Sequence, residues 1–255
     1  RMVQKKSTMV EKAKMKGVIL AGGTGSRLNP LTQVTNKHLL PIYNKPMIFY
    51  PLQTLIGSGV KDILIVTGGE NIGDFLRLLG SGRNLGVKLT YKCQDGSGGI
   101  PVALGLAKEF VNNEKFVCIL GDNVMENSIK NYVEEFHQSK SGARIFLKKV
   151  HDPKRFGLAE VKNNKVVACY EKPEHPTTDL AILGVYMFDG KVFDIIPTLK
   201  PSRRNELEIV DVLNHYIEND DLTYSILEGF WIDAGTFEAL FRASQFIEKK
   251  EIKNK

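Results

Sequence analysis

The chain has 255 residues, of which 42% are hydrophobic and 25% charged, so it can bury the core of one large domain or two small ones. This balance is typical of soluble globular proteins. The net charge of +6 does not indicate a nucleic-acid partner, because five basic residues and one acidic residue lie within positions 1–15 and the remainder is nearly balanced. Positions 1–15 also lack an apolar run that could form a signal peptide or span a membrane, which argues against a membrane partner.

Apolar runs alternate with amphipathic segments in the first half of the chain. They predict strands over 17–21, 62–68, 87–93 and 116–120, and helices over 46–55, 72–79, 103–111 and 129–137. Pro46 would lie at the start of the first of these helices. Strands and helices that alternate in this way predict an α/β fold with a doubly wound sheet of parallel strands.

The second half has a different pattern, with strands predicted over 143–150, 157–161, 165–170 and 181–188 and no helix between them. Asn163-Asn164 would form a hairpin turn. Helices are expected over 207–217, with Glu208 and Asp211 exposed, and over 236–247, capped by Thr236. We therefore predict one domain over 15–255, with a nucleotide-binding half at about 15–140 and a substrate-binding half at about 141–250. Residues 1–14 are expected to be a leader that an expression tag would explain.

The three cysteines of the chain form no Cys-x-x-Cys pair and lie in apolar, strand-like runs: Cys93, Cys118 and Cys169. This usage favours buried, reduced thiols over a disulfide or a zinc site. It predicts a cytoplasmic protein.

A glycine-rich loop, GGTGSRL at 22–28, directly follows the first predicted strand. Glycines let backbone N–H groups turn toward a phosphate because no Cβ blocks the approach. Arg27 and Lys37 add positive charge nearby. Leu28 replaces the third glycine of a dinucleotide-binding loop, and no Gly-Lys-Ser/Thr follows, so neither common fingerprint fits. The loop still predicts a polyphosphate ligand.

Ligands of open α/β sheets bind at the carboxyl ends of the strands, where four groups are expected: 21–27, 67–70, 94–99 and 122–123. Asp122 could hold Mg²⁺ or cap a local turn, and Asp233, just before the last helix, has the same two interpretations. The two aspartates meet only if the end of the chain folds back over the nucleotide site. Lys172 and Arg204, taken alone, are typical of solvated surface.

The chain resembles the sugar-1-phosphate nucleotidylyltransferases, and most closely their short-form glucose-1-phosphate thymidylyltransferases. The resemblance covers about 15–247 and rests on motifs that occur in the family's order: LAGGTGSRLNPLT, NKHLLP, LGDN, RFG, EKP, ELEIVD and WIDAGT. It implies a Rossmann-like nucleotide-diphospho-sugar transferase fold, with a mixed, mainly parallel sheet flanked by helices and an antiparallel-rich sugar-binding part. It implies Mg²⁺-assisted transfer of a nucleotidyl group from dTTP or UTP to glucose 1-phosphate, and a homo-oligomer, either a dimer or a tetramer.

The resemblance also implies a role for each matching residue. Those expected in catalysis are Arg27, Lys37, Asp122 and Arg204, with Mg²⁺ held by Asp122 and Asp233. Those expected to bind the nucleotide are Leu20, Ala21, Gly22, Gly23, Thr24, Gly25, Ser26, Gln94 and Gly99, the last two at a pyrimidine base. Those expected to bind the sugar phosphate are Asn123, Gly157, Glu171, Lys172, Ile182 and Gly184.

Several positions depart from the family's pattern while the phosphate machinery is retained: Asn29, Pro101, Val102 and Ile182. The same reaction with UTP or another sugar 1-phosphate is therefore an alternative. An alternative of another class is a non-catalytic sensor that binds a nucleotide sugar. A sensor need not keep all five of the charged residues that are present here: Arg27, Lys37, Asp122, Lys172 and Asp233.

Overall fold

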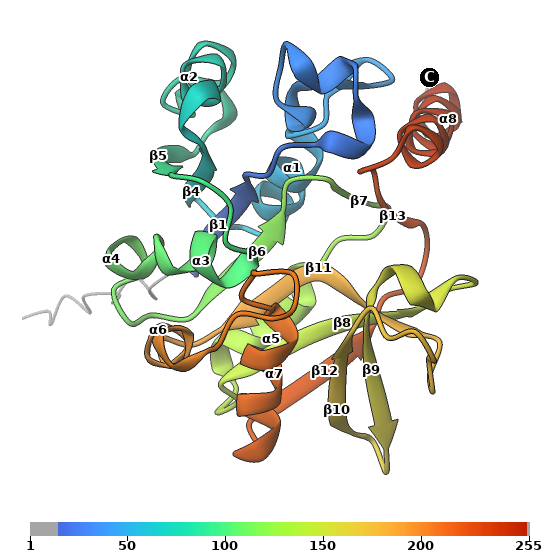
Figure 1. The fold of residues 1–255 in the computed structure, drawn as a ribbon. Coiled ribbons are helices and arrows are strands. Elements are labelled where there is room, and N and C mark those ends of the chain that lie inside the picture. The colour runs from blue at the N-terminus through green and yellow to red at the C-terminus, as the bar shows by residue number, and fades with distance from the viewer. Residues whose placement is uncertain (1–14, 254–255) are drawn as a thin grey trace, which may run out of the picture.

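The computed structural model describes residues 15–253 (Figure 1). The predicted leader over 1–14 lies outside the described residues. Four parallel strands form one side of the main sheet, in the order β6 (Phe116–Leu120), β1 (Lys16–Ala21), β4 (Asp62–Gly68) and β5 (Lys88–Gln94). These strands lie close to their predicted positions because β1, β4 and β6 are short apolar runs and β5, at the edge, alternates apolar with polar residues.

The other side of the sheet is largely antiparallel. Strand β11 (Leu180–Phe188) pairs with β6, with β8 (Ala143–Lys149) and with β9 (Gly157–Lys162), in each case antiparallel. Strand β9 forms a hairpin with β10 (Lys165–Glu171), and β12 (Leu222–Ile226) runs parallel to β8. The hairpin turn has φ values of 50° at Asn163 and 58° at Asn164, which confirms the predicted turn. The sheet is therefore mixed, as expected.

Helices cover both faces of the sheet. One face packs against α1 (Phe49–Gly57), α2 (Ile72–Leu79) and α5 (Lys130–Gln138). The other face packs against α3 (Ile100–Gly105), α4 (Lys108–Val111), α6 (Val192–Ile195) and α7 (Ile209–Glu218). Strand β1 serves both cores, because Val18 and Leu20 face one and Ile19 and Ala21 the other. No helix among residues 15–253 is long and apolar enough to cross a membrane.

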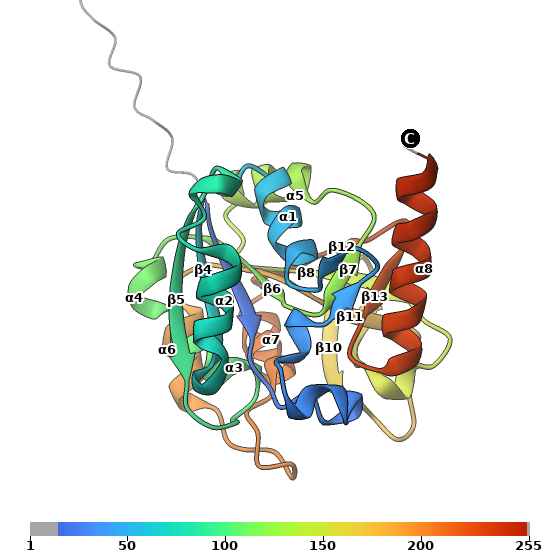
Figure 2. The ribbon, with the colours of Figure 1, turned by 90° about the horizontal axis from the view of Figure 1, so that it is seen from above.

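The last helix, α8 (Phe237–Lys253), lies at the opposite end of the molecule from α2 and α4 (Figure 2). It begins where predicted, and the Thr236 hydroxyl accepts a hydrogen bond from the N–H of Ala239 at 3.3 Å, as a cap does. It packs on a small third core that includes Ile42, Met47 and Ile232. Through this core, α8 packs against the segment 42–50, which follows Lys37 in the chain.

Three predicted helices differ from the structure by three or more residues at one end. Helix α8 continues to Lys253 rather than ending at 247. Helix α1 begins at Phe49 rather than at Pro46, because Pro46 belongs to a small hairpin of β2 (Pro41–Ile42) and β3 (Lys45–Pro46). The helix predicted over 103–111 is two short helices, and the first begins at Ile100.

Three predictions of exposure were wrong. Asp211, predicted to be exposed, is half-buried. Glu208 is 7% exposed and precedes α7, because its side chain turns inward rather than toward water. Cys93 is exposed because it lies on the edge strand β5, whereas Cys118 and Cys169 are buried; all three are free thiols.

A short ladder, which the sequence pattern did not reveal, brings the end of the chain back to its middle. Strand β7 (Asn123–Met125) pairs antiparallel with β13 (Trp231–Asp233), and Asp233 lies opposite Asn123. The N–H of Ala234 also donates to the carbonyl of Asp122 at 2.9 Å. The folding back on which a two-aspartate site depends is therefore present.

Candidate active site

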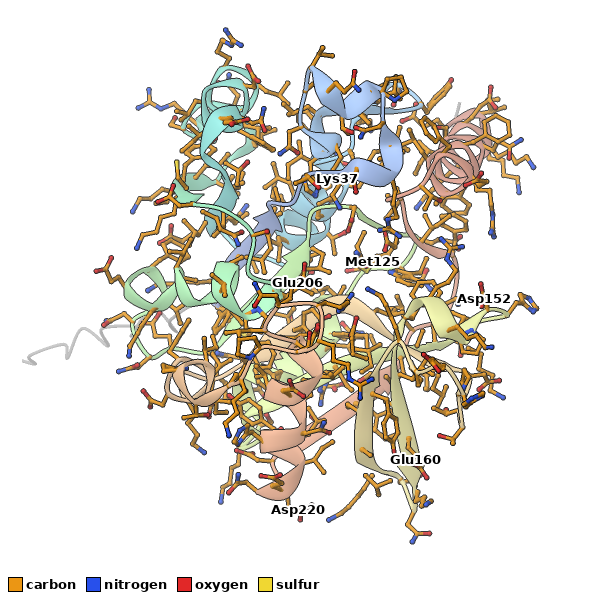
Figure 3. The ribbon with its side chains drawn as sticks, viewed as in Figure 1. Lys37, Met125, Asp152, Glu160, Glu206 and Asp220 are labelled. Atoms are coloured by element: carbon orange, nitrogen blue, oxygen red, sulfur yellow. The ribbon has the colours of Figure 1, made fainter. Side chains whose placement is uncertain are left out.

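A cavity of about 350 Å³ opens at the carboxyl ends of β1, β5 and β6. It is lined by residues from segments far apart in sequence, among them Lys37 and Glu206, which Figure 3 labels. The predicted residues that line it are Leu20, Gly22, Gly23, Arg27, Lys37, Gln94, Gly99, Asp122, Glu171, Lys172 and Arg204. Four residues predicted at the nucleotide are not among its lining: Ala21, Thr24, Gly25 and Ser26.

The glycine-rich loop packs closely against the residues that face it. A Cβ added at Gly22 would lie 2.8 Å from Oε1 of Gln94. At Gly25, where φ is 63°, an added Cβ would lie 3.1 Å from Cβ of Lys37. Gly25 thus has a structural role outside the cavity lining: its small size lets the loop pack against the stem of Lys37.

The second glycine-rich loop is joined to the segment before α7. The N–H of Leu207 donates to the carbonyl of Gly98 at 2.9 Å. Gly99 has φ of 89°, and a Cβ there would overlap the carbonyl oxygen of Leu207. Only glycine fits this position without strain, so the loop that would face the base is held by the loop that carries Arg204.

Lys37 and Asp122 form a largely buried ion pair, with Nζ and Oδ2 2.5 Å apart. Burial alone would favour the neutral form of each. For Asp122, the charge and hydrogen bond of Lys37 outweigh this effect and hold the pKa below its ordinary value. For Lys37, burial opposes the charge, but Asp122 raises the pKa above 10.5. Both groups are therefore ionised at neutral pH.

A buried histidine follows Lys37 in the chain and also lines the main cavity. His38 is 1% exposed, and burial together with the charge of Lys37 lowers its pKa to about 3. Its backbone N–H and its Nδ1 donate to Oδ1 of Asn36, at 2.9 and 2.7 Å. A Cβ at Gly121 would lie 2.6 Å from the imidazole ring. His38 is thus a neutral packing residue that fixes the backbone next to Lys37.

Asp122 and Asp233 lie near each other through the β7–β13 ladder, and their environments separate their pKa values. Burial and the charge of Asp122 raise the pKa of Asp233 to about 6, although Lys37 and Arg27 partly oppose this. Two nearby carboxylates repel each other when both are ionised, and a divalent cation bound between them would offset that repulsion. Hard oxygen ligands supplemented by phosphate oxygens and water suit Mg²⁺. Residues 15–253 contain no group of three or more acidic, histidine or cysteine side chains placed to hold a metal.

A smaller pocket of about 120 Å³ adjoins the main cavity and shares Glu171 and Lys172 with it. Its lining contains all the residues predicted for the sugar phosphate, together with Asp233: Asn123, Gly157, Glu171, Lys172, Ile182 and Gly184. A Cβ at Gly157 would lie 3.3 Å from Oε2 of Glu171. The two parts of the site therefore meet at a common border.

Asn123 is held in one orientation by three hydrogen bonds. Its Oδ1 accepts from the N–H of Gly184 at 3.1 Å and from Nε1 of Trp231 at 2.7 Å, and its Nδ2 donates to Oδ1 of Asp122 at 3.1 Å. A Cβ at Gly184 would lie 2.5 Å from Nδ2 of Asn123. Gly184 thus makes room for Asn123 in the wall of the pocket.

Arg155 and Trp231 line the smaller pocket and were missed in the sequence. Phe156, which is expected with Gly157 to help select the sugar, also lines this pocket, and its ring is 5.7 Å from that of Trp231. Trp231 is the single tryptophan of the chain and precedes Asp233 by two residues, which is a signal that could have identified it. Glu208 also lines the main cavity, and no local pattern marks it as buried.

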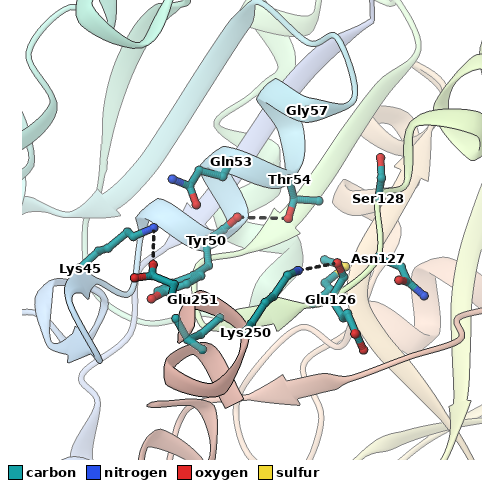
Figure 4. A pocket seen from close by; sticks show the side chains of 12 residues that line it. Lys45, Tyr50, Gln53, Thr54, Gly57, Glu126, Asn127, Ser128, Lys250 and Glu251 are labelled. Carbon is teal, nitrogen blue, oxygen red and sulfur yellow. Dashed lines mark hydrogen bonds and ion pairs between the residues drawn. The ribbon is translucent and has the colours of Figure 1, made fainter. Parts of the chain in front are cut away.

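Another cavity, of about 310 Å³, contains none of the predicted residues. It lies between α1, the segment 125–128 and α8 (Figure 4). Glu251 pairs with Lys45 at 3.3 Å, and Nζ of Lys250 donates to the carbonyl of Glu126 at 3.3 Å. These contacts attach α8 to the rest of the fold.

A mixed α/β sheet that gathers cations and paired carboxylates at the carboxyl ends of its strands is typical of an enzyme that acts on nucleotide phosphates. Residues 16–250 match the family model described as Nucleotidyl transferase, and the chain belongs to that family. A glucose-1-phosphate thymidylyltransferase of Neisseria meningitidis is 40% identical over 238 residues, which cover 92% of this chain and 83% of the relative. A low-salt glycan biosynthesis nucleotidyltransferase of Haloferax volcanii is 40% identical over 244 residues, 94% of this chain and 68% of the relative.

Solved structures give the same assignment of the fold. A crystal structure of a proposed glucose-1-phosphate thymidylyltransferase from Bacillus anthracis, in complex with sucrose, has a TM-score of 0.87 and 50% identity, covering 91% of this chain and 94% of that one. A UDP-glucose pyrophosphorylase complexed with UDP-glucose has a TM-score of 0.83, covering 93% of this chain and 100% of that one. At 24% identity, the second shows a common fold only.

Proposed function

We propose that this protein transfers a thymidylyl group from dTTP to glucose 1-phosphate, releasing dTDP-glucose and pyrophosphate. The names of relatives at about 40% identity support these two substrates. One structural observation carries the proposal: a cavity with Lys37, Asp122 and Arg27 joins a smaller pocket through a border that holds Lys172. Two anionic reactants would meet at that border.

The reaction is an in-line displacement at the α-phosphorus. A phosphate oxygen of the sugar phosphate forms the new bond as the bond from the α-phosphorus to pyrophosphate breaks, so the number of phosphoanhydride bonds is unchanged. Because both reactants are anions, the protein must supply positive charge and alignment rather than a covalent intermediate. Arg27 would hold the triphosphate, Lys37 would reach the phosphates at the reacting centre, and Lys172 and Arg204 would hold the sugar phosphate.

The ion pair of Lys37 with Asp122 positions the lysine before substrate arrives. A preorganised charge of this kind stabilises a transition state without reorganising during the reaction. Asp122 and Asp233 would hold Mg²⁺, which when bound supplies positive charge against the α-phosphate.

Gln94 is the residue proposed to recognise the base. It is 9% exposed at the end of β5, and its side-chain amide lies against Gly22. An amide oxygen can accept from N3–H of a pyrimidine, a group that thymine and uracil share. UTP is therefore the nearest alternative nucleotide.

The test is pyrophosphate release measured over a grid of nucleoside triphosphates and sugar 1-phosphates with Mg²⁺. We expect the highest kcat/KM with dTTP and glucose 1-phosphate. A higher value with another pair would change the substrates but not the reaction. If no pair in the grid gives pyrophosphate, the result would favour the nucleotide-sugar sensor and overturn the proposal.

The predicted homo-oligomer and cytoplasmic location stay predictions. Helix α8 exposes Phe237, Phe241 and Ile252, at 43%, 65% and 61%, which is compatible with self-association through this helix. Light scattering of the purified chain would give its mass in solution.

A further inference from the structure

Arg204 lines the main cavity, in the segment that precedes α7, and contacts Glu171, which lines both pockets. Its side chain is 44% exposed, and its Nη2 lies 3.0 Å from Oε1 of Glu171, which also lies 3.2 Å from Nζ of Lys172. A long, half-exposed arginine has many rotamers of similar energy, so something must hold it at this place.

The buried carboxylate of Glu208 provides that hold. Its Oε1 accepts from Nε of Arg204 at 3.2 Å, and its Oε2 accepts from Nη2 at 2.7 Å. The Ser202 hydroxyl donates to the same Oε1 at 2.6 Å. Glu208 stands at the N-cap of α7, yet its side chain accepts no capping hydrogen bond. Its carboxylate is therefore directed to the arginine rather than to the helix.

These contacts leave Nη1 of the guanidinium available. Glu208 accepts from Nε and Nη2, and Glu171 also accepts from Nη2 at 3.0 Å, whereas Nη1 donates no hydrogen bond to any of residues 15–253. A guanidinium presents its donors in a fixed planar fork, so fixing Nε and Nη2 also sets the direction of Nη1. Nη1 is therefore the donor that Arg204 keeps for an incoming phosphate.

The segment around Glu208 is itself anchored. Leu207 is joined to Gly98 by the backbone hydrogen bond described above, and the N–H of Ser202 donates to the carbonyl of Glu206 at 2.8 Å. The carboxylate that holds Arg204 therefore lies on a closed loop that is tied to the second glycine-rich loop.

We infer that Glu208 is a positioning residue, whose two-point contact aims Arg204 at the phosphate of the sugar 1-phosphate. The inference rests on the proposed function, because it assigns the phosphate that Arg204 meets. It predicts that the charge of Glu208 helps sugar-phosphate binding, although a carboxylate near a phosphate would by charge alone oppose it.

The test is Glu208→Gln in the full chain, with KM measured separately for dTTP and for glucose 1-phosphate. We expect KM for glucose 1-phosphate to rise by about 10- to 100-fold, because small displacements of a positioning group have effects of this size. KM for dTTP should change by less than about threefold. Melting temperature, measured on the same samples, separates this split from a general loss of folding.

Asp211→Asn is the matched control. It removes the same charge from a half-buried carboxylate next to Glu208, and Asp211 does not line either pocket. We expect both KM values to stay within about twofold of the wild type. In an Arg204→Ala background, Glu208→Gln should have no further effect, because residues that act as a unit are not additive.

Four results would overturn the inference: a fall in KM for glucose 1-phosphate, an equal rise in both KM values, no change, or an additive effect in the Arg204→Ala background. A fall would mean that Glu208 competes with the phosphate for Arg204. If the wild type does not release pyrophosphate with any of the substrate pairs, the proposed function fails and this inference fails with it. An active wild type with an unaffected Glu208→Gln variant overturns this inference alone.

Discussion

Replacing Asp233 by asparagine is expected to stabilise the protein at pH 8 when divalent cations are absent. Burial and the charge of Asp122 raise the pKa of Asp233 from 3.8 to about 6. The unfolded chain has no such neighbour, so its carboxyl group keeps the ordinary pKa. Folding at pH 8 therefore places an ionised carboxylate where it is disfavoured.

The magnitude follows from that pKa difference. A rise from 3.8 to about 6 is roughly two units at about 1.4 kcal/mol each, so the free energy of unfolding is lower by on the order of 3 kcal/mol above pH 6. Between pH 4 and 6 the folded state binds more protons than the unfolded state, so stability falls as pH rises through this window. The variant should therefore gain about 3 kcal/mol at pH 8 and about half of that at pH 5.

Urea denaturation in EDTA at pH 5 and pH 8, followed by circular dichroism, measures this gain. Asp152→Asn is a suitable control, because Asp152 is exposed at the edge of the molecule (Figure 3), and its effect should stay within about 0.5 kcal/mol. The reasoning is refuted if Asp233→Asn brings no stabilisation at pH 8, or if its gain is the same at both pH values.

Three other substitutions separate stability from function. Arg27→Ala should lower kcat by about 10²–10³-fold with little change in melting temperature, because the side chain is exposed; normal pyrophosphate release would remove Arg27 from the mechanism. Lys37→Ala should lower the free energy of unfolding by about 3–5 kcal/mol, because Asp122 would keep a buried charge without a partner, and unchanged denaturation would contradict the buried ion pair. Gly184→Ala should raise KM for the sugar phosphate by about 10-fold by displacing Asn123, while a parallel rise in KM for the nucleotide would point to a general distortion.

The sequence revealed the parts of the site that lie next to regular elements. The apolar run before Gly22 predicts a central strand, and the carboxyl ends of parallel strands meet at one edge. This reasoning predicted that Arg27, Gln94 and Asp122 lie close together, and in the structure all three line one cavity.

The parts that the sequence did not reveal depend on pairing between distant segments. Strands β7 and β13 have three residues each, which is too short for an alternating pattern, and their register alone brings Asp233 to Asp122. Glu208 resembles an exposed helix-start residue in sequence, because its half-exposed partner Arg204 lies in a loop without periodicity. Motif resemblance located Asp233 and Arg204 but not Glu208, and packing explains how all three are oriented.

The β7–β13 ladder has a consequence for the order in which the protein becomes functional during synthesis. Chains fold from the N-terminal side as they emerge, and the glycine-rich loop and Lys37 are translated long before Asp233. A nascent or prematurely terminated chain that lacks Trp231–Asp233 would present phosphate-directed cations with only one of the two carboxylates. If Asp233 holds Mg²⁺ as proposed, such a chain should bind nucleotide without turning it over, and the ladder would couple the onset of activity to translation of the C-terminal segment.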